Sequence, residues 1–126
     1  EGRAMVNISG KQIIPAAVRY VQNLAESLNA VKLASPKAST YAQEKLLNQA
    51  SQYLEEIERA REVLLGHLEE ALEITDEKKK AFFFHELITK DMRDLREPAD
   101  LLETIMDKSL WPFPSYGDLL YEVSEI

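Results

Sequence analysis

Residues 40–74 of this sequence are TYAQEKLLNQASQYLEEIERAREVLLGHLEEALEI, and the spacing of their apolar positions decides the fold class. These positions follow one another at helical intervals in a near-heptad rhythm: Leu47, Ala50, Leu54, Ile57, Leu64, Leu68 and Ala71. Such spacing places side chains along one stripe of an α-helix. Thr40 and Gln43 have capping-box spacing, so we expect a helix from Thr40 to about Ile74. At ~1.5 Å per residue it is roughly 50 Å long and needs a partner of similar length.

The segment before Thr40 predicts one such partner. Its apolar residues also recur at intervals of four and three: Ile14, Val18, Val21, Ala25 and Leu28. Pro15 has no N–H, and its ring would strike the carbonyl of Lys11 in a regular helix. We therefore expect a kink between Gly10 and Pro15, or a fresh helix start with Pro15 in its first turn. Residues 34–39, with Pro36 at their centre, form the connection to the next helix.

The segment after Ile74 predicts a second partner. Thr75 and Asp76 are good N-cap residues, and a helix beginning there carries an inner face of Ala81, Phe84, Ile88, Met92 and Leu95. Pro98 is expected to start a fourth, shorter helix with apolar residues at Leu101, Leu102, Ile105 and Met106. Because Phe82, Phe83 and Phe84 together cover most of a helix circumference, one ring must point away from the bundle centre.

The chain changes character at Ser109. Residues 111–117, WPFPSYG, hold two prolines and three aromatic residues and cannot form regular helix. We expect an extended tail whose rings Trp111, Phe113 and Tyr116 fold back on the helices or dock on a partner. The fold class predicted for residues 1–126 is therefore all-α. It is a single domain, an antiparallel bundle of three long helices with a short fourth helix and an extended aromatic and proline-rich C-terminal tail.

Composition and charge exclude several classes of function. The 126 residues include 22 acidic and 15 basic side chains, for a net charge of −7, which disfavours nucleic acid and anionic membrane surfaces as partners. The absence of cysteine excludes thiolate metal sites and cysteine nucleophiles. No apolar run approaches the ~20 residues of a membrane span, and no signal peptide is visible. These features predict a cytoplasmic domain, and the start at Glu1 indicates a piece of a larger protein.

Two histidines are the main candidates for chemistry. His67 and His85 are equally far in sequence from Asp76, so they can face each other across a helical hairpin. Bundle metal sites place a glutamate three residues before each histidine, but Leu64 and Phe82 occupy those positions, which favours ordinary surface or rim histidines. No glycine-rich phosphate loop is visible either. We therefore assign no catalytic, cofactor-binding or metal-binding residue to this chain.

Four stretches of the sequence carry a family resemblance. The tail contains Trp111-Pro112-Phe113-Pro114-Ser115-Tyr116-Gly117-Asp118 within residues 110–123, the chain opens with EGRAMV at 1–6 and KQIIPA at 11–16, and MRDLR at 92–96 lies between them. Taken in chain order, these stretches resemble the type III glutamine synthetases. The resemblance runs from the segment that follows the family's catalytic region to its C-terminal signature. The tail motif is the specific one.

The resemblance implies a parent enzyme that joins glutamate and ammonia to give glutamine through a γ-glutamyl phosphate. It would use ATP and Mg in a large double-ring homo-oligomer. The family's catalytic residues lie in the preceding catalytic region, so the chain alone is expected not to be an enzyme and to hold no cofactor. One hypothesis is a structural or assembly domain that contacts the catalytic region of the same polypeptide. The alternative is an independent helical-bundle interaction module that uses the tail as a docking peptide.

Overall fold

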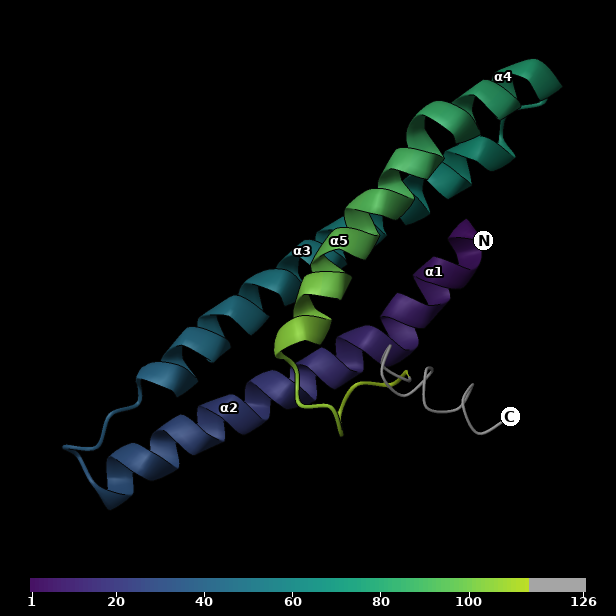
Figure 1. Cartoon of the computed structure of the whole chain (residues 1–126). Coiled ribbons are helices and arrows are strands. Elements are labelled where there is room, and N and C mark those ends of the chain that lie inside the picture. Colours follow the sequence, from purple (N-terminus) through teal and green to yellow (C-terminus); the bar gives the residue numbers. More distant parts are fainter. Residues whose placement is uncertain (114–126) are drawn as a thin grey trace, which may run out of the picture.

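The computed structural model of the chain describes residues 1–113 and folds them into three long helical segments (Figure 1). In chain order the elements are α1 (Gly2–Ile8), the π-helical turn η1 (Ser9–Ile13), α2 (Ile14–Ala34), α3 (Tyr41–Leu72), α4 (Glu77–Phe83), the π-helical turn η2 (Phe84–Ile88) and α5 (Thr89–Ile105). No strand occurs within the described part, so the all-α prediction is confirmed. None of these helices combines the length and the apolar character needed to cross a membrane.

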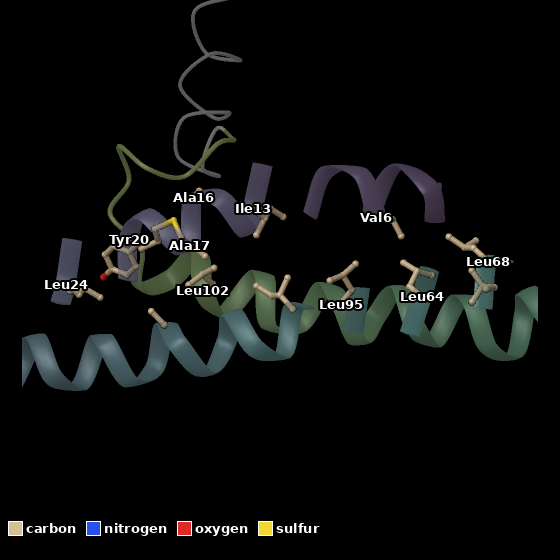
Figure 2. Packing of buried hydrophobic residues seen from close by; sticks show 14 residues of the cluster. Val6, Ile13, Ala16, Ala17, Tyr20, Leu24, Leu64, Leu68, Leu95 and Leu102 are labelled. Carbon is tan, nitrogen blue, oxygen red and sulfur yellow. The ribbon is translucent and has the colours of Figure 1, made fainter. Parts of the chain in front are cut away.

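Helix α3 contacts both other segments and supplies the central stripe of the core. The buried residues of α3 are Ala50, Ile57, Leu64, Leu68 and Ala71, all of which belong to the predicted heptad-like stripe. They pack against the other two helical segments, where Val6, Ile13, Leu95 and Leu102 are labelled among the buried side chains of Figure 2. The apolar spacing of α3 therefore predicts its buried face correctly.

The start of α3 is predicted correctly, but its capping interaction is not. Thr40 is the N-cap, yet its side chain makes no hydrogen bond to the backbone N–H groups of the first turn. Its hydroxyl instead donates to the Glu44 carboxylate at 3.0 Å. Thr40 has φ −118° and ψ 23°, which is not the extended conformation that aims an N-cap oxygen at those N–H groups.

The first segment departs from regular helix at the position that Pro15 predicts. The π-helical turn η1 ends at Ile13, and Pro15 then lies in the first turn of α2. A proline is tolerated there because its missing N–H and fixed φ are compatible with a helix start. The structure thus places a departure from regular α-helix between Gly10 and Pro15, but Ile13 and Ile14 keep helical φ and ψ angles, so the chain makes no fresh helix start there.

The buried face of α2 is rotated by about one residue from the predicted stripe. Ile13, Ala17, Tyr20 and Leu24 are buried, whereas Val18 is 50% exposed. Ala16 and Ala17 are completely buried, and small side chains permit close approach of a neighbouring helix. Tyr20 can be buried because its hydroxyl donates to the Ile105 carbonyl at 2.5 Å. The predicted stripe was drawn mainly from large aliphatic residues. It therefore included neither the buried Ala16 and Ala17 nor the buried Tyr20.

Pro98 does not start a fourth helix, because α5 continues through it to Ile105. A proline in a helix interior removes one backbone hydrogen bond and costs about 3 kcal/mol. Here the proline ring is buried on the same stripe as Leu95 and Leu102, and this packing offsets the loss. The predicted fourth helix is therefore the last part of the third segment.

The inner face of the third segment also differs from the prediction at its start. Asp76 is the N-cap as expected, since its carboxylate accepts from the Lys78 N–H at 2.9 Å. Ala81 and Phe84 are exposed, however, and Phe83 is the half-buried residue of the three phenylalanines. The π-helical turn η2 follows at once and changes the helical phase, so a constant period drawn back from Leu95 gives the wrong face before Ile88.

Candidate docking surface

A turn after α5 aims the aromatic tail back across the helices. Met106 is the C-cap of α5 in an extended conformation. The Asp107 carboxylate then accepts hydrogen bonds from the backbone N–H of Ser109 at 2.9 Å and from its hydroxyl at 2.8 Å. These two bonds stabilise the ionised carboxylate and hold the pKa of Asp107 below its usual range. The Leu110 N–H donates to the Asp107 carbonyl at 2.9 Å, which closes the turn.

Tyr20 ties this turn to α2. Its hydroxyl donates to the Ile105 carbonyl, the last one of α5, at 2.5 Å. Burial raises the pKa of Tyr20, and the negative charge of Asp107 adds to the effect. The phenol donates its hydrogen bond to a carbonyl that has no partner within its own helix.

Trp111 and Phe113 lie half-buried against the core, with their rings edge-on and the ring centroids 6.1 Å apart. They form one side of an apolar groove of about 780 Å³, whose other lining residues include Met5, Ile8 and Met92. The groove therefore runs between the first and third helical segments, and the tail borders it. Tyr116, the third ring predicted to dock, lies outside the described residues.

The rim of this groove is charged and exposed. Glu1, Arg93, Arg96 and Asp100 border it, and Arg96 Nε lies 3.7 Å from Asp100 Oδ2. Exposed pairs of this kind contribute only ~0 to 1 kcal/mol. An apolar floor with a charged rim is suited to holding apolar side chains of another segment.

Tryptophan fluorescence tests the placement of the tail. Trp111 is the only tryptophan, and we expect its emission to be blue-shifted and partly protected from a soluble quencher, because the ring is half-buried against the core. Met5→Ser, which makes the groove wall polar, should shift the emission toward the red. Emission like that of free tryptophan in the dilute monomer would contradict the described position of the tail.

A hydrogen bond between His67 and Asp91 is a further polar feature of the fold. The sequence did not predict it. The Nδ1 of His67 is hydrogen-bonded to the carboxylate of Asp91, and its ring meets Phe83 edge-on at a centroid distance of 5.8 Å. Asp91 is only 3% exposed. One sequence signal for the burial of Asp91 was available. Asp91 lies three residues after Ile88 and four residues before Leu95, on the same helical stripe.

The structure gives the two histidines different surroundings. His67 is engaged by Asp91, while His85 is exposed. Within residues 1–113, no group of three or more histidine, aspartate and glutamate side chains is placed to hold a metal ion. The hydrogen bond between His67 and Asp91 joins α3 to α5.

Arg61 shows how a charged residue can occupy the buried stripe of α3. Its Nε donates to the Val6 carbonyl at 3.1 Å, and its Nη1 lies 3.5 Å from the Glu58 carboxylate. Gly10 makes room for this guanidinium, because a Cβ at position 10 would lie 2.5 Å from Arg61 Nη2. The hydrogen bond joins α3 to α1, and the guanidinium lies beside Gly10 of the π-helical turn η1.

Comparisons with known proteins find glutamine synthetases, the family that the tail motif resembles. No family model matches the sequence, and no solved structure matches it. The chain is 24% identical over 127 residues to the type-3 glutamine synthetase of Dictyostelium discoideum. It is 28% identical over 128 residues to a glutamine synthetase of Bacteroides fragilis. Each match covers 96% of this chain but only 17% of the relative. The resemblance to type III glutamine synthetase is confirmed, and the coverage fits a C-terminal domain of a larger polypeptide.

Proposed function

We propose that this chain is the non-catalytic C-terminal helical domain of a glutamine synthetase and has a structural or assembly role. The observation that carries the proposal is the similarity of 96% of the chain to 17% of two glutamine synthetases. The fold is compatible with it, since a few polar contacts of the described residues join different helical segments. His67–Asp91 and Arg61–Val6 are the clearest examples.

The reaction itself belongs to the proposed parent enzyme. That enzyme would ligate ammonia to glutamate with ATP and Mg, in the cytoplasm and as a homo-oligomer. Its catalytic region would precede this domain in the same polypeptide. In this arrangement the helical domain contributes surfaces for contact, such as the apolar groove beside Trp111 and Phe113.

Removal of the domain tests this role. We expect a full-length polypeptide truncated before residue 1 to sediment as smaller assemblies than the intact enzyme. We expect residues 1–126 alone to have no glutamine synthetase activity and to give a flat calorimetric titration with ATP and Mg. An Arg59→Ala enzyme is the control, because Arg59 is exposed and its guanidinium pairs with the neighbouring Glu55 side chain of the same helix at 2.9 Å. Unchanged assembly after truncation, or saturable ATP binding by the chain, would contradict the proposal.

The alternative is an independent interaction module, and the apolar groove of about 780 Å³ is the observation that favours it. The sequence encoded immediately upstream of Glu1 separates the two functions. A glutamine synthetase catalytic region there supports the first, and an unrelated sequence supports the second.

A further inference from the structure

The apolar groove between the first and third helical segments has room for further apolar side chains. It has a volume of about 780 Å³, and its apolar lining from the helices is Met5, Ile8, Ile13, Met92, Leu95 and Ala99. Ile8 is 37% exposed in the part of the chain that the structure describes. Single exposed apolar residues are ordinary, but a continuous apolar groove marks a contact surface. The groove is therefore suited to an apolar occupant.

The described part of the chain ends on this groove. Helix α5 ends at Ile105, and the turn at Asp107 brings Trp111 and Phe113 onto the groove wall. Figure 1 shows this turn carrying the chain from the end of α5 to the junction of α1 and α2. Residues 114–126 follow Phe113 directly and so begin beside the groove. A segment tethered at so short a separation has an effective concentration in the millimolar range, an advantage that a separate molecule lacks.

The sequence of residues 114–126, PSYGDLLYEVSEI, is amphipathic when read at helical spacing. Its apolar residues recur at intervals of three and four along one stripe: Tyr116, Leu119, Leu120, Val123 and Ile126. A second, adjacent stripe is acidic and consists of Asp118, Glu122 and Glu125, and the segment contains no basic residue. As a helix, the segment would span about 20 Å, and the groove follows α5 from Thr89 to Asp100 over about 16 Å. Length and pattern therefore both fit the groove.

The rim of the groove carries charges that complement this acidic stripe. Arg93 and Arg96 border the groove from α5, three residues apart and exposed. Within residues 1–113 Arg93 takes part in no ion pair, and Arg96 Nε lies 3.7 Å from Asp100 Oδ2. Glu1 and Asp100 are the carboxylates on the same rim, so an acidic stripe is directed to the arginines. Exposed pairs contribute little affinity, but complementary charges fix the orientation of a bound segment.

We propose that residues 116–126 of this chain dock in the groove, with their apolar stripe on its floor and their acidic stripe toward Arg93 and Arg96. The inference goes beyond the proposed function and does not depend on it, because the occupant belongs to this chain in either case. The contact surface at this end of the domain is then the groove together with the segment that fills it.

A spin label observed by NMR tests the docking in residues 1–126. The chain has no cysteine, so Ser124→Cys accepts a single nitroxide label at a position outside both stripes. Met5 and Met92 line the groove, and the label should remove most of the intensity of their methyl signals, at high and low protein concentration alike. Ser35→Cys is the matched control, since Ser35 is exposed at the far end of α2 and its label should leave both signals unchanged.

Two results would overturn the proposal. Unchanged Met5 and Met92 signals in the labelled Ser124→Cys chain would show that the segment lies elsewhere. Broadening of these signals by a label on a different copy of the chain would make a second copy the occupant.

The charges of the rim are tested separately. Arg93→Glu should weaken the broadening, whereas Lys37→Glu, an exposed change in the connection between α2 and α3, should not. Equal broadening in these two variants would contradict the orientation of the acidic stripe toward the arginines. A failure of the proposed function is a different result, because it appears as unchanged assembly after truncation and not in these signals.

Discussion

Replacing His67 with leucine is expected to destabilise the domain by about 3 kcal/mol, one of the two largest effects of a single substitution that we predict. Asp91 is 3% exposed, and His67 is the hydrogen-bonding partner of its carboxylate. Removal of one partner of a buried pair leaves the other without compensation for its lost hydration. Urea denaturation at neutral pH, followed by circular dichroism, measures the change in the free energy of unfolding.

Two further variants identify the cause of this loss. His67→Leu combined with Asp91→Leu should recover most of the stability, because two apolar side chains leave no buried charge unpaired. His85→Leu is the matched control, and its effect should stay within about 0.5 kcal/mol, since His85 is exposed. If the double variant is less stable than His67→Leu alone, the unpaired Asp91 carboxylate is not the source of the loss.

The sequence predicted those parts of the fold in which apolar periodicity is regular and long. The buried face of α3 follows directly from its spacing, because a stripe sustained over many turns has only one phase that buries it. The N-cap at Asp76 was also predictable, since a short carboxylate at a helix start accepts nearby N–H groups.

The two misplaced faces have different physical causes. Each π-helical turn changes the relation between residue number and direction, so a single period carried across η2 assigns Phe84 inward instead of Phe83. In α2 the buried positions include Ala16, Ala17 and Tyr20, whose burial depends on close helix approach and on one hydrogen bond to Ile105. Neither condition is visible before the partner helix is in place.

The partners of two charged residues on the apolar stripes were not predicted from the sequence. Asp91 and Arg61 both occupy positions on apolar stripes, and sequence spacing alone cannot tell a solvated charge from a paired one. The structure provides the partners, which are His67 for Asp91 and the Val6 carbonyl for Arg61. Each partner is distant in sequence, and the pairing therefore emerges only with the tertiary fold.

The core stripe of α3 gives the second large expected effect. Ile57 is completely buried at the centre of the helix, so Ile57→Ala should destabilise by about 2 to 5 kcal/mol. The loss combines the transfer free energy of the removed methyl and methylene groups with the unfilled cavity they leave. Thermal and urea unfolding of the purified chain would both report it.

Val63→Ala on the same helix is the control, because Val63 is 50% exposed and its side chain gains little from folding. It removes two methyl groups while lowering β-branching, which favours helix, so its net effect should be within about 0.5 kcal/mol. The two variants thus differ in burial far more than in helix propensity. Equal urea midpoints would mean that α3 is rotated from the described phase, with Ile57 at the surface. A midpoint lowered only by Ile57→Ala would place the stripe of Ala50, Ile57 and Leu64 at the centre of the fold.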